Sequence, residues 1–400
     1  MVDNWVVKQE FPHTGASVSA SLAAHIAQRI DTRGGWLPFD EFMHSALYTP
    51  GLGYYANSSA KFGHMPPTAQ QEGSDFVTAP ELSPLFGACL GEQVAQALQA
   101  SNTQHVVEFG AGSGALALQI CELLAHSGCA LEQYFIVELS ANLRARQQEK
   151  LAAWAGKITW LDALPPTIHG VVIGNEVLDA MPVKLLARKA GVWYERGVAF
   201  ERSAQSMGGE LKNGQFKNGN FVWQDRASSL RPPVDIPGSH DYLTEIHPQA
   251  EAFMQTLAQH LVRGVAFFVD YGFPESEYYH PQRHMGTLMC HFEHRADPDP
   301  LAMVGLKDIT AHVNFSAIAL AGQDAGLDVL GYITQARFLM NCGLLQKMEG
   351  VTLTQRAMAA KLATEHEMGE LFKVVGFAKG IDVAQFEPLG FANGDRSHTL

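Results

Sequence analysis

Apolar residues recur along this chain with two different spacings, and each spacing predicts a different kind of element. Between residues 17 and 30 (SVSASLAAHIAQRI) and again between 38 and 48 (PFDEFMHSALY) they have helical spacing. Both segments are therefore predicted to be amphipathic helices. After His105 short apolar runs alternate with helical stretches, and the runs read HVVEFG, YFIVELS, ITWLDALP and GVVIGNEVL. Such alternation predicts parallel strands joined by crossover helices.

The pattern changes again after the fourth of these strands. Residues from about 185 to 245 have β-character and contain the turn GQFKNGN, which predicts a β-rich insertion. A helix (HPQAEAFMQTLAQHLVRG) then leads into a fifth strand, GVAFFVDYG. The segments LDVLGYITQARFL and LFKVVGFA predict two more strands as an antiparallel edge, with a second insertion at about 275–325. We therefore expect an α/β fold, a doubly wound Rossmann-like sheet over residues 101–400, after a helical N-terminal section over 1–100.

The charge of the chain narrows the classes of partner. There are 41 acidic and 28 basic residues, a formal net charge of −13. A general nucleic-acid binder needs a basic surface, so nucleic acid is not an expected partner. The acidic balance suits a cationic partner, although many proteins are acidic only to remain in solution.

Cysteine usage and hydropathy bear on location. The five cysteines contain no CxxC pair and read as reduced thiols. No apolar stretch approaches the roughly 18 residues of a membrane span, so membrane insertion is not expected. The first residues, MVDNWVVKQEFPHTG, lack the features of a secretory signal or a transit peptide. The sequence therefore predicts a cytoplasmic protein.

Candidate chemistry begins at the end of the first parallel strand. The run from Glu108 to Gly114 (EFGAGSG) connects this strand to the following helix. Glycines let the backbone approach a ligand, and the helix start favours a polar or anionic group. Gly110 and Gly112 also fit the dinucleotide fingerprint. Two features favour S-adenosylmethionine (SAM) instead: the carboxylate of Glu108, which would repel a pyrophosphate, and Gly114, which completes the E-x-G-x-G-x-G form typical of methyltransferases.

Two acids at the ends of the next strands fit the same cofactor. Glu138 ends the second strand and is predicted to bind both ribose hydroxyls of SAM. It would equally serve as the ribose acid of a dinucleotide enzyme. Asp162 ends the third strand, where an acid often accepts the adenine amino group, but it could also be an exposed turn residue.

The fourth strand ends in a polar run that is predicted to carry the reaction. Asn175 and Glu176 lie where open α/β sheets place ligands and reacting groups, and Asn175 is expected to line the cofactor site as well. Asp179 follows three positions after Glu176, so a helical turn would put both acids on one face. The alternative interpretation is a helix start, with Asn175 as its cap.

The chain resembles the MidA-like methyltransferase family, and the resemblance extends over nearly its whole length. Its motifs are residues 39–55, 75–87, 108–114, 137–144, 175–182, 270–272, 286–290, 308–315, 335–338, 369–373 and 388–397. The resemblance implies a class I SAM-dependent methyltransferase core with an extra lobe over the acceptor site. Mitochondrial members of this family methylate an arginine of a respiratory complex I subunit.

The resemblance adds expectations for several residues. Asp75, Thr78 and Glu81 are expected to fold over SAM as a lid or wall, and Pro80 is expected to contact SAM as well. Residues 78–81 could equally be an N-cap and a first helical turn. His312, with Asp308, is expected in the acceptor wall. Departures at His291 and Asn314 are expected to affect acceptor contacts.

The function expected from these observations is transfer of a methyl group to an arginine of a partner protein, such as a complex I subunit. Asn175, Glu176, Asp179 and His312 are the candidate catalytic residues. No metal is expected, because Cys290, His291 and His294 have no second ligand pair at a known spacing. A small-molecule methyltransferase and a SAM-binding assembly factor without turnover are the alternatives.

Overall fold

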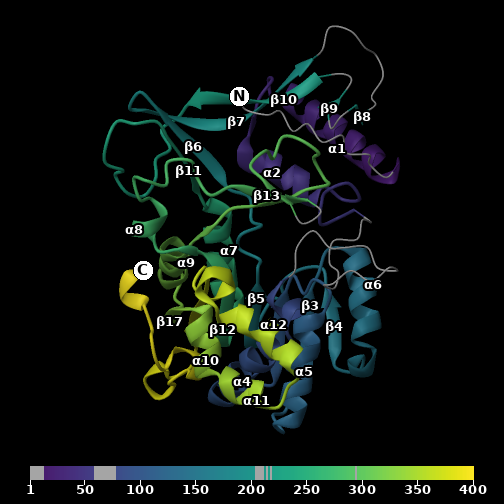
Figure 1. The fold of residues 1–400 in the computed structure, drawn as a ribbon, viewed down its shortest axis with the longest axis vertical. Coiled ribbons are helices and arrows are strands. Elements are labelled where there is room, and N and C mark those ends of the chain that lie inside the picture. The colour runs from purple at the N-terminus through teal and green to yellow at the C-terminus, as the bar shows by residue number, and fades with distance from the viewer. Residues whose placement is uncertain (1–12, 58–77, 203–210, 213–214, 217–218, 293–294) are drawn as a thin grey trace. The chain divides into compact units, whose positions relative to one another are not determined.

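The computed structural model describes residues 13–57, 78–202, 211–212, 215–216, 219–292 and 295–400 (Figure 1). The chain forms two compact units. The smaller unit comprises residues 1–59, 182–246 and 284–310, and the larger comprises 60–181, 247–283 and 311–400. The expected boundary at residue 100 differs from this division, because the described residues 78–100 belong to the larger unit.

The larger unit is built on the predicted α/β sheet. Within the described residues its strand order is β17-β18-β12-β5-β2-β3-β4, with β16 paired to β12. The strands are β2 (His105–Phe109), β3 (Gln133–Val137), β4 (Ile158–Leu161), β5 (Ile168–Asn175), β12 (Leu261–Phe273), β16 (Val313–Asn314), β17 (Asp328–Thr334) and β18 (Phe372–Lys379). Strands β2, β3, β4, β5 and β12 are parallel, whereas β18 is antiparallel to both β12 and β17. The prediction of a doubly wound sheet with an antiparallel edge is confirmed.

The larger unit also contains α-helices. They are α3 (Ala79–Leu82), α4 (Pro84–Ser101), α5 (Ala115–His126), α6 (Ala141–Lys150), α7 (Pro248–His260), α8 (Glu275–Tyr278), α9 (Phe315–Asp324), α10 (Gln335–Asn341), α11 (Leu344–Glu349) and α12 (Leu353–Ala363). None of the helices in the described ranges is long and apolar enough to cross a membrane.

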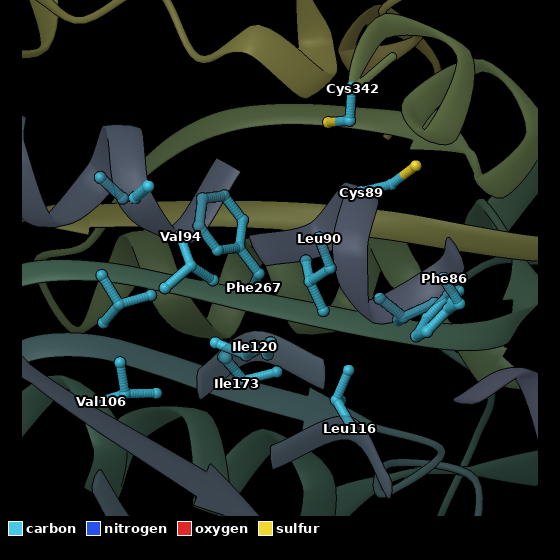
Figure 2. Packing of buried hydrophobic residues seen from close by; sticks show 14 of the residues in the cluster. Phe86, Cys89, Leu90, Val94, Val106, Leu116, Ile120, Ile173, Phe267 and Cys342 are labelled. Atoms are coloured by element: carbon cyan, nitrogen blue, oxygen red, sulfur yellow. The ribbon is translucent and has the colours of Figure 1, made fainter. Parts of the chain in front are cut away.

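Both faces of the sheet are covered, and this explains the apolar runs in its strands. Phe267 of β12 and Ile173 of β5 belong to one buried cluster, with α4 and α5 (Figure 2). Their neighbours Phe268 and Val172 belong to a second cluster, with α7 and α9. Because successive residues of a strand face opposite sides, a strand buried on both faces is apolar without alternation. Fully burying each such side chain contributes about 1.5–3 kcal/mol.

The smaller unit contains the two predicted N-terminal helices, α1 (His13–Thr32) and α2 (Phe39–Tyr48). Its main sheet has the order β11-β6-β7-β10-β9-β8, with β1 paired to β7. The strands are β1 (Leu37–Pro38), β6 (Lys184–Lys189), β7 (Val192–Arg202), β8 (Leu211–Lys212), β9 (Gln215–Phe216), β10 (Gly219–Ala227) and β11 (Tyr242–Ile246). A further sheet is formed by β13 (Met289–Phe292), β14 (Arg295–Asp297) and β15 (Asp308–Thr310).

The β-rich insertion is confirmed, and its first hairpin has a simple local cause. Lys189 and Val192 pair across a two-residue loop formed by Ala190 and Gly191. Both loop residues have positive φ, 48° and 81°. A two-residue hairpin loop of this type has the twist of the strands that it joins.

Candidate functional site

The glycine-rich turn between β2 and α5 adopts a backbone that favours glycine. Gly110, Gly112 and Gly114 have φ values of 59°, 54° and 82°. An added Cβ atom at Gly110 or Gly114 would meet nothing closer than 3.4 Å, so the constraint there is the backbone angle rather than space. Gly114 is the N-cap of α5. The turn thus brings exposed backbone to a helix N-terminus, which suits the carboxylate of a methionine moiety.

Glu138 lies beside this turn at the end of β3, and its side chain is held from two sides. One carboxylate oxygen accepts a hydrogen bond from the backbone N–H of Ser140 at 2.8 Å, and the other accepts from the Gln147 side chain at 3.0 Å. Gln147 also donates to the carbonyl of Gly112 at 2.9 Å. Burial raises the pKa of Glu138. Gln147 therefore fixes the acid predicted to bind ribose relative to the glycine-rich turn.

Leu139 and Asp162 lie near Glu138 but are exposed to solvent, whereas Glu138 is buried. Leu139 is 76% exposed although it is apolar, whereas Glu138 is 7% exposed. The Asp162 side chain is 86% exposed and forms an ion pair of 2.5 Å with Arg144. This arrangement agrees with the exposed-turn interpretation of Asp162, and its contact with adenine stays a prediction.

Glu108 is buried under the turn rather than open to solvent. It is 2% exposed, and one of its oxygens accepts a hydrogen bond of 2.6 Å from the Tyr134 hydroxyl. Burial raises its pKa to about 7, against the opposing effect of the Tyr134 hydrogen bond. Near neutral pH the carboxyl group is therefore close to the midpoint of its titration.

Thr78 and Pro80 lie in the short helix next to the glycine-rich turn. Thr78 is the N-cap of α3, without a side-chain capping bond, and the carbonyl of Pro80 accepts from the Gln119 side chain at 2.8 Å. Glu81 accepts a hydrogen bond from the Ser113 hydroxyl within the turn. Thr78 therefore caps a helical turn, as the alternative interpretation predicted, and this helical turn lies next to the glycine-rich turn. Contact of Thr78 and Pro80 with SAM stays a prediction. Asp75, the other residue of the predicted lid, lies outside the described residues.

The turn after β5 gathers the candidate catalytic groups in an unusual backbone. Glu176 has a φ of 54°, and its N–H donates to the carbonyl of Val269 at 2.9 Å. Such an angle in a non-glycine residue costs about 1–3 kcal/mol and persists only where the surroundings impose it. The Asn175 amide donates to the Glu176 carboxylate at 3.0 Å. These two side chains therefore lie together at the carboxyl edge of the sheet.

Asp270 of β12 imposes this turn. One of its oxygens accepts three backbone hydrogen bonds, from Val177 at 3.1 Å, Leu178 at 2.9 Å and Asp179 at 3.2 Å. Burial raises the pKa of Asp270, and the charges of Asp179 and Glu176 raise it further. Two buried acids, Asp179 and Asp270, thus lie near the half-buried Glu176 in a turn that backbone donors hold in place.

Asp179 and Asn175 offer acceptors that the fold does not satisfy. Asp179 is 5% exposed, and burial raises its pKa to about 6, against a hydrogen bond from Tyr271. In the described part of the chain, the Oδ1 atoms of Asp179 and Asn175 are buried and have no hydrogen-bond partner. An unsatisfied buried acceptor costs about 1–3 kcal/mol, so this site favours a ligand that brings N–H donors.

His312 joins this region through the end of β12. Its ring stacks on Phe273 with centroids 5.3 Å apart and meets the Tyr271 ring edge-on at 5.1 Å. The preceding residue, Ala311, donates its N–H to the carbonyl of Asp179 at 3.0 Å. The larger unit therefore brings together all four candidate catalytic residues.

Two residues expected near the acceptor have other contacts. Asp308 belongs to the smaller unit, where its carboxylate accepts from the Tyr55 hydroxyl at 2.8 Å. Asn314 accepts from the N–H of Ala317 at 3.2 Å and so caps α9. His294 lies outside the described residues, and within them no group of three or more His, Cys, Asp or Glu could hold a metal ion.

Comparison with known proteins decides between the cofactors. The profile of the family described as "Putative S-adenosyl-L-methionine-dependent methyltransferase" matches residues 89–333. This chain belongs to that family. A Burkholderia thailandensis protein crystallised with S-adenosyl-homocysteine is 47% identical and covers 98% of this chain and 100% of its own, with a TM-score of 0.89. A native crystal structure from the same organism is 46% identical, with the same coverage and a TM-score of 0.85.

Curated relatives add the class of acceptor in those proteins. "Protein arginine methyltransferase NDUFAF7, mitochondrial" from Danio rerio is 26% identical, over 94% of this chain and 91% of its own length. The Drosophila melanogaster homologue is 26% identical, over 92% and 87%. The SAM-dependent methyltransferase predicted from the sequence is therefore confirmed, and the dinucleotide alternative is excluded. The expected cytoplasmic location is wrong, because it conflicts with relatives that are named as mitochondrial proteins.

Three residues that lie at these turns have no role in the sequence-based prediction. Leu139 and Asp270 fall within motifs of the MidA-like family without an assigned role, and Gln147 falls in none. Gln147 is a fully buried amide in a helix whose other polar residues are mostly exposed. In the sequence, Gln147 is marked only by its place on the buried side of the predicted helix. Helical spacing does not show which residue of another element it contacts.

Proposed function

We propose that this methyltransferase transfers the methyl group of SAM to an arginine side chain of a partner protein. The observation that carries the proposal is the pair of unsatisfied buried acceptors on Asn175 and Asp179, beside the Glu176 carboxylate. A guanidinium group carries five N–H donors in a planar fork and binds carboxylates in bidentate fashion. The names of the curated relatives support the same acceptor.

The residues at the carboxyl ends of β2 and β3 have the chemistry that SAM binding needs. We assign the ribose hydroxyls to Glu138, the methionine carboxylate to the glycine-rich turn and the cationic amine to Glu108. The exposed apolar face of Leu139, with Asp162, is assigned to adenine. When bound, SAM supplies an electrophilic methyl group on a sulfonium sulfur.

Glu176 and Asp179 reduce the electrostatic repulsion between an arginine acceptor and the sulfonium group of SAM. A guanidinium stays protonated in proteins and must approach a sulfonium cation. Two unit charges about 4 Å apart repel by on the order of 4 kcal/mol at an effective dielectric constant of about 20. Glu176 and Asp179 offset this repulsion and orient the planar group for in-line attack, in which the N–C bond forms as the C–S bond breaks and S-adenosyl-homocysteine leaves. The proton that the attacking nitrogen loses passes to the Glu176 carboxylate. His312 and Tyr271 form the aromatic wall of the same site.

The specific form of the proposal is that the acceptor is a respiratory complex I subunit, as the MidA-like resemblance implies. The test is to incubate the purified enzyme and labelled SAM with a lysate from a strain that lacks this gene, and to map the labelled site by mass spectrometry. We expect label on an arginine. Label on a lysine, a carboxylate or a nucleic acid would refute the arginine assignment. Label only in a small molecule would replace it by a metabolite acceptor, and no transfer in a single turnover would favour a SAM-binding assembly factor.

A further inference from the structure

A cavity of about 610 Å³ adjoins the end of β12, and the proposed reaction gives it no role. Its walls come from the end of β12, from β17 and β18, and from the C-terminal residues. Phe273 lies in its wall and also stacks on His312. The cavity therefore lies next to the candidate acceptor site, within the same compact unit.

The buried groups of this cavity are hydrogen-bond donors. Tyr332 is 1% exposed, and in the described residues its hydroxyl has no hydrogen-bond partner. Lys373 is 5% exposed, and its ammonium donates to the carbonyls of Glu370 and Leu371. Within the described ranges it forms no ion pair, and its cationic head lies 5.9 Å from the centre of the Phe273 ring. Both groups would gain from an acceptor placed between them.

The charges around these donors leave one positive charge without compensation. Arg396 pairs with Glu370 at 2.6 Å, so these two charges cancel. The charge of Glu277 at the rim is offset by that of Arg283, which lies 3.7 Å from the centre of the Phe273 ring. Glu365 is exposed at the rim of the cavity. In the described residues, the ammonium of Lys373 is the buried charge of this cavity that has no paired acid. A group with one negative charge fits this balance, whereas the second charge of a phosphate would be opposed by the acids at the rim.

We propose that this cavity binds a carboxylate of the acceptor protein, adjacent to the arginine that is methylated. The proposal rests on the proposed function, since it takes the acceptor to be a protein. The carboxylate receives hydrogen bonds from Tyr332 and Lys373, while the arginine occupies the site of Asn175, Glu176 and Asp179. Recognition of a carboxylate next to an arginine would restrict methylation to a small set of sequences.

Tyr332→Phe is the sharpest variant for a test, because it removes only a hydroxyl that the folded protein leaves unpaired. Its thermal stability should therefore not fall. Lys373→Met keeps most of the side-chain stem and removes the charge, and Glu365→Gln at the rim is the matched control. In a first arm, the purified chain is titrated with acetate, and with phosphate at equal ionic strength, while chemical shifts and melting temperature are recorded. We expect saturable acetate binding in the wild type and the control, and at least tenfold weaker binding in the other two variants.

A second arm measures methyl transfer to the acceptor protein. In Tyr332→Phe and Lys373→Met we expect the KM for the acceptor to rise about tenfold, with kcat and SAM affinity unchanged. When the acceptor's carboxylates near the arginine are replaced by amides, the KM of the wild-type enzyme should rise by the same factor of about ten. The KM of Tyr332→Phe should hardly change, because this variant has already lost the contact.

Three outcomes would overturn the proposal. These are unchanged acetate binding in both variants, preference for phosphate, or acetate binding without any effect of the acceptor's carboxylates on KM. The last would assign the cavity to a free carboxylate metabolite. Failure of arginine methylation alone would refute the proposed function but would leave the acetate titration unaffected.

Discussion

Glu138 and Glu176 both follow a strand of the parallel sheet, but their surroundings differ. Glu138 is buried and accepts hydrogen bonds from Ser140 and Gln147, which hold the carboxylate in one orientation. Glu176 has a strained backbone and lies beside two unsatisfied acceptors. We therefore assign cofactor affinity to the first acid and methyl transfer to the second, and the two can be separated by substitution.

Replacing Glu138 should weaken SAM binding. Each hydrogen bond to a charged group contributes about 1.5–3 kcal/mol, so Glu138→Ala should lower the affinity by tenfold or more. Isothermal titration calorimetry measures this directly, with the exposed Glu149→Ala on α6 as the control. An unchanged affinity would remove Glu138 from the cofactor site.

Replacing Glu176 should slow the reaction without loosening the cofactor. Glu176→Gln preserves shape and removes the charge that faces the acceptor, and such a loss in a site protected from water costs about a hundredfold in rate. Single-turnover transfer and SAM affinity are measured on the same preparation. If both fall together, Glu176 belongs to the cofactor site or to the fold.

Glu108 should make SAM binding depend on pH. Burial raises its pKa to about 7, against the lowering effect of the hydrogen bond from Tyr134 and with a smaller contribution from the Glu138 charge. A cationic amine favours the ionised form, so binding should release a proton, and affinity should rise between about pH 6 and 8. Calorimetry in buffers of different ionisation enthalpy counts that proton. Glu108→Gln should lose this part of the pH dependence, and its persistence there would assign the effect to another group.

At the scale of elements, the turn after β5 depends on a residue from β12. Asp270→Ala would leave three backbone N–H groups without their acceptor, at a cost of at least about 3 kcal/mol. We expect a lower melting temperature, and a kcat that falls more than SAM affinity because Glu176 and Asp179 lose their positions. Asp382→Ala, which removes an exposed cap on Ala384, should cost about 1 kcal/mol or less. Equal effects of the two substitutions would contradict this role of Asp270.

The elements themselves could be predicted, whereas the contacts between them could not. Strands such as β5 and β12 were predictable because burial on both faces leaves an uninterrupted apolar run, and the glycine-rich turn because its positive φ angles favour glycine. Gln147 and Asp270 were not assigned, since each acts on a turn that is distant in sequence. The expected boundary at residue 100 follows a change in pattern, but the chain divides near residue 60. Local periodicity does not record which helix packs on which sheet.

At the scale of the whole molecule, the acidic balance bears on how a cationic acceptor is found. Under the proposed function, the net charge of −13 would attract a basic segment over a distance set by salt, whereas the contacts at Asn175 and Asp179 would act only once the segment is bound. Electrostatic attraction of this kind changes the association rate more than the rate of chemistry. The two contributions therefore respond differently to ionic strength.

Salt should slow the capture of the acceptor protein without slowing methyl transfer. The Debye length shrinks from about 30 Å at 0.01 M to about 8 Å at physiological ionic strength, so the attraction by distant surface acids is lost over this range. We expect the association rate constant, measured by stopped-flow fluorescence, to fall at least tenfold, while kcat at saturating acceptor changes less than twofold. Affinity for S-adenosyl-homocysteine should change little and serves as the control, because the contacts assigned to it are short-range and do not depend on distant surface acids. A fall in kcat with a constant association rate would mean that salt acts inside the active site, and the net charge would then have no role in acceptor capture.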